Sequence, residues 1–551
     1  MQSCMIKTIM KTFIILVCLF FINGSVKSAE YFIATDGNDS NDGSEQLPWK
    51  SLGYGFAQII DGDTLTVREG IYRLVEETNL SVINKPNITF QGYPGETVQL
   101  FGSATTEGKV WQPYNANVWR IAADFFNNDP KGMFNNHVRV EHQSDLDGGR
   151  DHDFVYNLVN PNMWTKADIN GDQCFSSNTG CYIYLYPAVG EDPNTQVYEL
   201  SQRSMARVAG NGDYMLVKNI EFYYTQSTAI FFEGADFITL DGNVFGNTSN
   251  GNDNSYAIRI WDSEGSVVKN NRVFDSKYWG GYSNSKGITF MVTKQGEPNV
   301  VEYNEIYDIP GFDAIGVKSG VSNLIVRYNY IHDVYSAFTP GGSRCVWSAT
   351  NTDGCQSTDI EYRPGGNWKI YGNIVVNATN GVNLPGYIND GDDNQIYNNV
   401  FYQVQSGIKL GWDGTFGNVI ANNIFISNES GIYLQSGGTV TTVPDYLDQY
   451  TSNNNLFFNN SNADIHLRPS WSGGYTFGTP YSLSQFQGLF NREVDSLSSD
   501  PVFVNTSSFE LSENSPALDA GDGSFWGSPS VDIGAYPYSD FSNIIFVSGF
   551  E

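Results

Sequence analysis

Lys318 is the residue whose position in the sequence predicts the most specific chemistry. It directly follows the short alternating apolar segment 314–317. A lysine in a groove lined by aromatic residues and glycine can remove the C5 proton of a uronic acid, provided that nearby positive charge lowers its pKa. The position therefore favours a β-eliminating lyase with Lys318 as the base. A lysine that simply faces solvent is the alternative.

Aspartates offer a competing chemistry. Asp392 and Asp393 lie in the segment INDGDDNQIYNN, and Asp413 follows about one repeat later in GWDGTFGN. Glycoside hydrolases use two carboxyl groups about 5–5.5 Å or 6.5–9.5 Å apart, which neighbouring coils of a repeat structure can supply. These three residues are thus candidate acids of a hydrolase. An exposed turn, with or without bound calcium, is the alternative.

Aromatic residues suggest that the substrate is a sugar. Trp261, Trp347 and Trp412 fall at the ends of repeats or in the loops between them, and Arg344 lies close to Trp347. Aromatic faces stack on the apolar C–H surfaces of sugar rings, so these residues are candidates for substrate binding. Packing of long loops against the body of the protein is the alternative explanation.

A repeated asparagine organises the region that holds these candidates. An Asn followed one residue later by Phe, Ile, Tyr or Val recurs at intervals of 24 to 44 residues, and short alternating strands such as AIRIW, AIGVK and GIKLG recur with it. Three short strands per coil would stack in parallel and bury a continuous apolar column. We therefore expect an all-β, right-handed parallel β-helix, rather than a leucine-rich repeat or a propeller. The repeated residues are Asn243, Asn271, Asn304, Asn329, Asn373, Asn399, Asn423 and Asn455.

The flanking segments complete the expected organisation. Lys7 and Lys11 precede a short apolar run, which is typical of a secretion signal and too short to span a bilayer. The stretch 105–205 interrupts the repeat, and its sequence predicts an inserted strand-rich module. We expect a signal peptide in 1–28, a cap and first coils in 29–104, the module in 105–205, coils and a closing segment in 206–540, and a tail in 541–551.

The amino-acid composition argues against nucleic acid as a binding partner. The chain of 551 residues has a formal net charge of −30, which repels nucleic acid phosphate. We expect an exported monomer without a membrane span, located in the periplasm, on the cell surface or outside the cell. Export also favours two local disulfides, Cys174 with Cys181 and Cys345 with Cys355.

The segment DAIGVKSGVSN resembles N-E-I-I-x-x-K-S-x-x-x-N of the alginate lyase and chondroitinase B family. The resemblance implies that Lys318 is the Brønsted base and that Asp313 helps to hold calcium. The family's R-H-G motif is replaced by SAFTPGGSR, so Arg344 is displaced and Arg327 is a conjectural substitute for the acid. The segment YAIRIWDSEG is also similar to D-G-I-D-x-W of pectate lyases, although Arg259 stands where a calcium-binding aspartate would be.

Arg327 also has a purely structural explanation. The repeat register predicts an outward column of Lys269, Glu302 and Arg327, whose alternating charges would satisfy one another. An acidic polysaccharide approaching this acidic chain would need a local cluster of Lys and Arg, which residues 286–344 can supply. The sequence thus favours a calcium-assisted polysaccharide lyase, with a glycoside hydrolase or a non-catalytic glycan-binding surface protein as alternatives.

Overall fold

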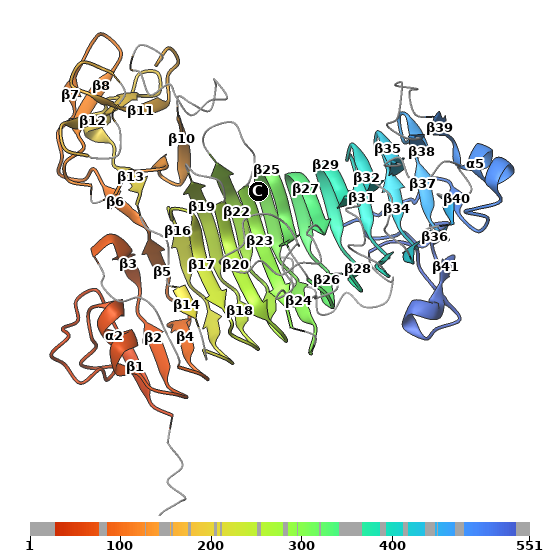
Figure 1. Ribbon diagram of the computed structural model, residues 1–551, viewed down its shortest axis with the longest axis horizontal. Coiled ribbons are helices and arrows are strands. Elements are labelled where there is room, and N and C mark those ends of the chain that lie inside the picture. Colours follow the sequence, from red (N-terminus) through yellow and green to blue (C-terminus); the bar gives the residue numbers. More distant parts are fainter. Residues whose placement is uncertain are drawn as a thin grey trace, which may run out of the picture.

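The computed structural model is a long solenoid of stacked coils with a separate β module at one end (Figure 1). It describes residues 28–76, 85–126, 128–142, 155, 158–172, 174, 178–202, 207–209, 212–250, 255–278, 285–294, 296–318, 321–340, 366–385, 393–411, 417–435, 447–448, 450–468 and 479–535.

Each complete coil contributes three parallel strands, which stack into three columns along the axis. A twelve-stranded sheet forms the first column, and a twenty-stranded sheet forms the second and third columns. The first column contains β1 (Glu30–Ile33), β2 (Thr64–Val67), β4 (Thr89–Gly92), β15 (Leu216–Lys218), β18 (Thr239–Asp241), β21 (Val267–Lys269), β24 (Asn299–Glu302), β26 (Leu324–Arg327), β28 (Lys369–Tyr371), β30 (Gln395–Tyr397), β33 (Asn418–Ala421) and β36 (Tyr450–Asn453).

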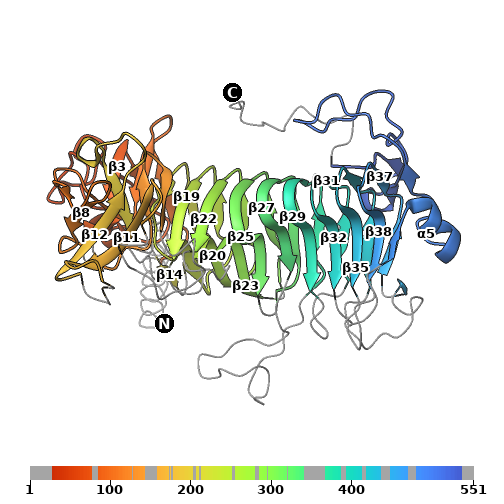
Figure 2. The same cartoon turned by 90° about the horizontal axis from the view of Figure 1, so that it is seen from above.

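The second and third columns share three long strands, in which the corner of the coil is a bend within one strand (Figure 2). The second column contains β3 (Gly70–Arg73), β5 (Val98–Phe101), β16 (Glu221–Tyr223), β19 (Val244–Asn250), β22 (Arg272–Tyr278), the first parts of β25 (Glu305–Lys318), β27 (Tyr330–Pro340) and β29 (Ile374–Pro385), then β31 (Val400–Tyr402), β34 (Ile424–Ile426), β37 (Leu456–Phe458) and β40 (Leu497–Ser498). The third contains β14 (Arg207–Ala209), β17 (Thr228–Glu233), β20 (Ser255–Ser263), β23 (Ser285–Thr293), the later parts of β25, β27 and β29, then β32 (Ser406–Gly411), β35 (Ser430–Gln435) and β38 (Ala463–Arg468), with β39 (Thr479–Tyr481) antiparallel to β38.

The predicted asparagine ladder forms at the turn between the first and second columns. The residue before each ladder asparagine takes a left-handed conformation, which turns the chain inward; Asn270, with φ 56°, is one example. Each asparagine amide then bonds the asparagine and the backbone of neighbouring coils, as where Asn304 Nδ2 donates to Asn329 Oδ1 at 2.9 Å and to the Val268 carbonyl at 2.9 Å. Inward Ile, Val and Phe side chains fill the remaining interior. The prediction of a parallel β-helix is thus confirmed.

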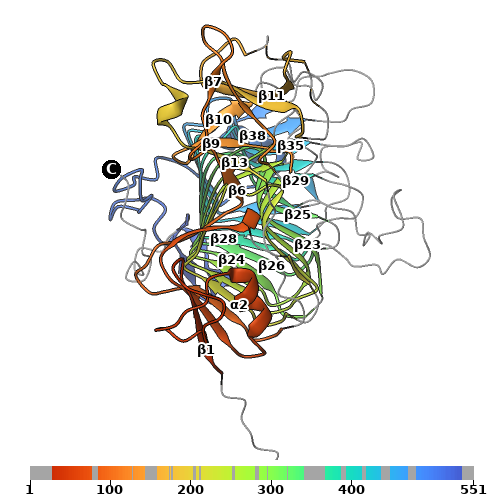
Figure 3. The same ribbon diagram turned by 90° about the vertical axis from the view of Figure 1, so that its left-hand side faces the viewer.

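The inserted module is an eight-stranded sheet with its own apolar core. Its strands are β6 (Ser103–Thr105), β7 (Gln112–Pro113), β8 (Trp119–Ala122), β9 (Met133–Asn135), β10 (Val138–His142), β11 (Met163–Asp168), β12 (Cys181–Tyr186) and β13 (Tyr198–Ser201). Viewed along the solenoid, the module lies to one side of the coils (Figure 3). The predicted disulfide between Cys174 and Cys181 closes a loop that leads into β12.

Short helices and a returning segment cover the ends of the solenoid. Helix α2 (Leu52–Gln58) packs its Leu52 and Phe56 on the first coils, and α5 (Leu483–Phe490) contacts β38 and β39. Residues 503–535, which include β41 (Gly521–Asp522) and β42 (Ser530–Val531), fold back over the outer face of the second column from β29 to β37. Within the part of the chain that the structure describes, neither helix has the length or apolar character needed to cross a membrane.

Candidate functional site

The outward face of the third column carries a compact group of polar residues around Gly316. The strand register places Thr289 of β23 and Thr339 of β27 on either side of Gly316 in β25. The carboxyl group of Asp313 folds over this glycine, since a Cβ added to Gly316 would lie 3.0 Å from Asp313 Oδ2. Lys286, the register partner of Asp313, completes what we call the Gly316 cluster: Lys286, Thr289, Asp313, Gly316 and Thr339.

A buried ion pair is the main electrostatic feature of this cluster. The Lys286 ammonium lies 3.2 Å from Asp313 Oδ2, and the two side chains are only 8% and 2% exposed. The ammonium also lies 4.6 Å from the centre of the Phe312 ring. Burial raises the pKa of Asp313 to about 6, and the positive charge of Lys286 opposes a larger rise. Removing two charges from water costs several kcal/mol per ion, so a pair on the outer face of a solenoid points to a site.

The cluster also holds a polar atom whose hydrogen-bonding capacity is unused. The hydroxyl oxygen of Thr289 is buried without a hydrogen-bond partner. The Thr339 hydroxyl, in contrast, bonds the Asp313 carboxyl group and opposes the rise in its pKa. Buried polar groups are nearly always hydrogen-bonded, so the Thr289 hydroxyl is an exception beside Gly316.

Lys318 lies on the same strand, two residues beyond Gly316, although the description of this residue covers only its backbone. At about 3.3 Å per residue, its Cα is therefore about 7 Å from that of Gly316. Its register partner in the preceding coil is Met291. Met291 pairs in turn with Trp261, and Trp261 pairs with Glu233, as the repeat predicted. The structure thus places Lys318 and Asp313 on the same strand, β25.

Arg259 and Trp261 extend this face by two coils. The Arg259 guanidinium carbon lies 4.6 Å from the Phe231 ring centre, 5.0 Å from that of Trp261 and 5.2 Å from that of Tyr256. Trp261 itself is half-buried. The predicted sugar-binding tryptophan therefore shares the third column with the Gly316 cluster, beside a cation held among aromatic rings.

Arg327 lies on a different face. It ends β26 in the first column, where its Nε donates to Glu302 at 2.7 Å and its Nη1 donates to the Tyr371 hydroxyl at 2.9 Å. The predicted column of Lys269, Glu302 and Arg327 is confirmed by the strand register. Because its sheet differs from that of Lys318, the structure does not bring Arg327 to the Gly316 cluster, and the conjecture of an acid beside Lys318 finds no support there.

Among the remaining predicted site residues, the structure describes Asp393. This residue is exposed, with φ 59°, and precedes β30. Seven further residues lie outside the described part of the chain: Arg344, Trp347, Asp392, Trp412, Asp413, Cys345 and Cys355.

The surroundings of Asp313 do not fit the calcium ion that the resemblance implied. Calcium takes six to eight oxygen ligands, whereas Asp313 Oδ2 is in contact with an ammonium group. Among the described residues, no group of three or more His, Cys, Asp or Glu side chains could hold a metal ion.

Sequence reasoning missed a second polar network, on the outer face of the second column. Arg272 donates to Glu305 at 3.1 Å and to the Tyr307 hydroxyl at 2.8 Å, while His332 lies 3.7 Å from Glu305 and 2.7 Å from Asp333. Burial acts to lower the pKa of His332, but the bonds to Glu305 and Asp333 outweigh it and raise that pKa. The sequence signal that could have revealed this network is that its residues occupy matching outward positions in the neighbouring strands β22, β25 and β27.

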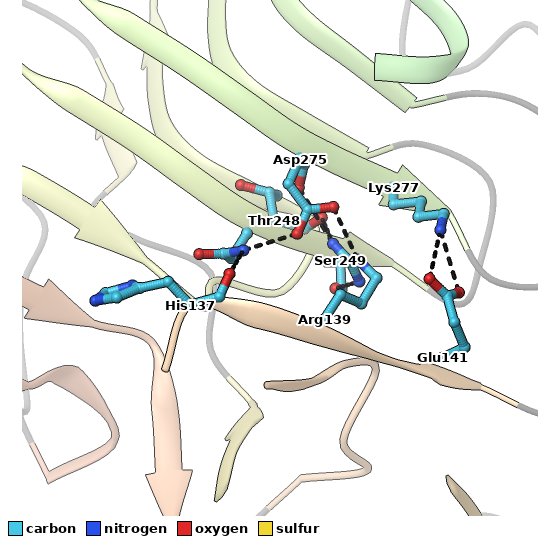
Figure 4. Close-up of polar contacts among 8 residues, drawn as sticks. His137, Arg139, Glu141, Thr248, Ser249, Asp275 and Lys277 are labelled. Carbon is cyan, nitrogen blue, oxygen red and sulfur yellow. Dashed lines mark hydrogen bonds and ion pairs between the residues drawn. The ribbon is translucent and has the colours of Figure 1, made fainter. Parts of the chain in front are cut away.

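Next to this network, the inserted module docks on the coils through charged side chains (Figure 4). Arg139 of β10 donates to Asp275 at 2.8 Å and to the Ser249 hydroxyl at 2.6 Å. Two residues further along β10, Glu141 accepts a bond from Lys277 at 3.0 Å. These contacts fix the module against β19 and β22.

Comparisons with known proteins agree with this architecture. Residues 205–352 and 295–457 match a family described as the right handed beta helix region. A solved structure described as a glycoside hydrolase has a TM-score of 0.54 at 13% identity, covering 78% of this chain and 96% of the other. The complex of XylC with xylose gives 0.48 at 13% identity, covering 86% of each chain, and pectate lyase Pel9A gives 0.44 at 12% identity, covering 93% and 96%. The family match and the likeness to the glycoside hydrolase structure show the fold, a right-handed parallel β-helix.

A sequence relative adds only local similarity. The protein YwoF of Bacillus subtilis (strain 168) is 26% identical over 87 residues, which are 16% of this chain. The matched segment covers 19% of the length of YwoF.

Proposed function

We propose that this protein is an exported enzyme that cleaves an acidic polysaccharide by β-elimination, with Lys318 as the base. The observation that carries the proposal is the buried ion pair of Lys286 and Asp313, because Asp313 belongs to β25, the strand that ends at Lys318. Perturbed, buried ionisable groups concentrate at functional sites. The similarity in fold to a glycoside hydrolase supports action on carbohydrate in general.

The chemistry follows from the positions of the positive groups. The neutral amine of Lys318 would remove the C5 proton of a uronic acid, the electron pair would form the C4–C5 double bond, and the bond from C4 to the glycosidic oxygen would break. Positive charge nearby favours the neutral form of a lysine and also stabilises the negative charge that develops on the uronate. Lys286 and Arg259 provide positive charge in the third column of a chain whose net charge is −30.

Asp313 favours a second candidate function. A buried carboxyl group whose pKa is raised to about 6 is suited to act as a general acid toward a glycosidic oxygen. In that case the protein would be a glycoside hydrolase, and a second carboxylate would have to complete the pair.

One assay separates these functions from glycan binding without cleavage. The protein is incubated with alginate, pectate, chondroitin and neutral glycans, with and without calcium. Ultraviolet absorbance from an unsaturated product indicates a lyase, new reducing ends without it indicate a hydrolase, and retention without cleavage indicates a binding protein. We expect absorbance from an acidic glycan, and its loss in Lys318→Ala with circular dichroism unchanged. Absorbance that persists in that variant would refute the role of Lys318.

A further inference from the structure

Lys409 of β32 is a half-buried lysine that stands near another cation. Burial lowers its pKa, and the positive charge of Arg468 lowers it further. Among the residues that the structure describes, no carboxylate forms an ion pair with Lys409 or Arg468. Arg327 in the first column, in contrast, lies 2.6 Å from Glu302. Two neighbouring cations without an anion repel each other, so this arrangement calls for an anion from outside the chain.

Tyr433 joins the two cations. It is the register partner of Lys409 in β35, and the Lys409 ammonium lies 5.9 Å from the centre of its ring. Arg468 Nη1 donates to the Tyr433 hydroxyl at 3.3 Å. The His466 ring packs edge-on against the same tyrosine, with ring centres 4.9 Å apart. Tyr433 therefore positions Arg468 near Lys409, and we call Lys409, Tyr433 and Arg468 the Lys409 cluster.

The Lys409 cluster offers many hydrogen-bond donors together with two positive charges. An ammonium group carries three N–H donors and a guanidinium group carries five. Within the described part of the chain, the Tyr433 hydroxyl accepts one of them. The remaining donors can bond the oxygen atoms of a carboxylate or a sulfate, whose charge the two cations would neutralise. This chemistry matches the anionic group of an acidic sugar.

The cluster lies in the same column of strands as the Gly316 cluster. The strand register joins Ile408, which precedes Lys409, to Ile315, which precedes Gly316, through one residue in each of the two coils between them. Lys409 and Gly316 thus occupy the same position of the third column, three coils apart. At about 4.8 Å per coil, their Cα atoms are about 14 Å apart. A sugar chain lying along the solenoid axis can span that distance.

We propose that Lys409, Tyr433 and Arg468 form a subsite that binds the anionic group of one acidic sugar residue in a polysaccharide. The neighbouring sugars extend along the axis toward β25, the strand that ends at Lys318. This inference deepens the proposed function and rests on it for the polysaccharide as the ligand. It makes Lys409 a residue that binds the polymer without taking part in its cleavage.

The first test measures binding to the full-length Lys318→Ala protein. Calorimetric titrations use oligomers of mannuronate, galacturonate and glucuronate, and their carboxyl-reduced neutral forms. We expect at least one acidic oligomer to bind, and its neutral form to bind about tenfold or more weakly, because it lacks the charged acceptor. Chondroitin oligomers with and without sulfate distinguish a carboxylate from a sulfate as the bound group.

Substitutions in that background identify the subsite. Lys409→Met and Arg468→Met should each weaken binding of the acidic oligomer about tenfold, which corresponds to the loss of one charge-assisted hydrogen bond. Lys409→Arg keeps the charge and should recover most of the affinity. The matched control Lys369→Met removes an exposed lysine of β28 in the first column, and it should stay within about twofold because a remote exposed charge is screened.

Stability and kinetics separate binding from a structural role. Lys409→Met relieves the repulsion from Arg468, so it should unfold at the same or a higher temperature than the unmodified protein, as measured by circular dichroism. With polymer as substrate and Lys318 intact, Lys409→Met should raise KM about tenfold and leave kcat within about twofold, because the subsite binds the ground state and the transition state equally.

Three results would overturn the inference. They are that no acidic oligomer binds, that Lys409→Met and Arg468→Met both bind normally, or that Lys409→Met weakens binding only together with a lower unfolding temperature. If no substrate is cleaved but binding depends on Lys409, the lyase proposal fails while the subsite stands. If cleavage occurs and Lys409→Met leaves KM unchanged, the subsite fails while the lyase stands.

Discussion

The asparagine ladder allows a quantitative prediction for Asn329→Ala. The Asn329 side chain, 1% exposed, donates to the Val301 carbonyl at 3.0 Å, the Arg327 carbonyl at 3.0 Å and Asn373 Oδ1 at 2.9 Å. Its Oδ1 also accepts from the backbone and side-chain amides of Asn304 at 3.1 and 2.9 Å.

Truncation to alanine leaves at least two buried polar groups of the neighbouring coils without partners, and each costs about 1–3 kcal/mol. We therefore expect Asn329→Ala to lower the free energy of unfolding by about 2–6 kcal/mol, a large part of the ~5–15 kcal/mol typical of a folded protein. Urea unfolding monitored by circular dichroism measures this change.

The control is an asparagine of the same coil region outside the ladder. Asn367 is exposed and donates only to Asn323 Oδ1, at 2.7 Å, and its backbone is left-handed with φ 55°, so Asn367→Ala should lower stability by about 1 kcal/mol, mainly through backbone strain. If Asn329→Ala lowers stability no more than Asn367→Ala does, the ladder does not supply the stability that we assign to it.

Three further outcomes are expected. Arg139→Ala should expose the module to limited proteolysis, because Asp275 and the Ser249 hydroxyl lose their donor, and a cleavage pattern identical to that of the unmodified protein would contradict this role. Burial lowers the pKa of His142 to about 3, below its unfolded value of about 6.5, so the unfolded chain binds more protons between these values. Stability should therefore fall by up to about 1.4 kcal/mol per pH unit as the pH drops from 6.5 towards 3, and His142→Gln should flatten this dependence in thermal unfolding. Reduction of the disulfide between Cys174 and Cys181 should lower the unfolding temperature of the module by only a few degrees, because the loop that it closes is short. If reduction lowers the unfolding temperature of the coils and leaves that of the module unchanged, this expectation is wrong.

The repeat predicted the scaffold well because its signal is periodic. The ladder asparagines, the charged column through Glu302 and the register from Trp261 to Lys318 all follow from one spacing, and the strand pairs confirm them. Each depends only on which residue stands one coil away. A single sequence contains that information.

The contacts that define the candidate site depend on side-chain conformation as well as on the repeat. Lys286 and Asp313 are register partners with the same offset as Ile288 and Ile315, but the repeat does not show that their side chains form a buried ion pair over Gly316. The contact of Arg139 with Asp275 joins residues 136 positions apart and obeys no repeat. The sequence therefore assigned Asp313 to a metal, while the folded chain pairs it with a lysine.

The place where the module enters the solenoid has a consequence for how such proteins can vary. β4 pairs directly with β15, and β5 pairs directly with β16, so the rungs on either side of the module meet as though the intervening hundred-odd residues were absent. Whole domains can thus be gained, lost or exchanged at this corner while every later rung keeps its alignment. A lineage could alter what is held above the coils without rebuilding the coils themselves.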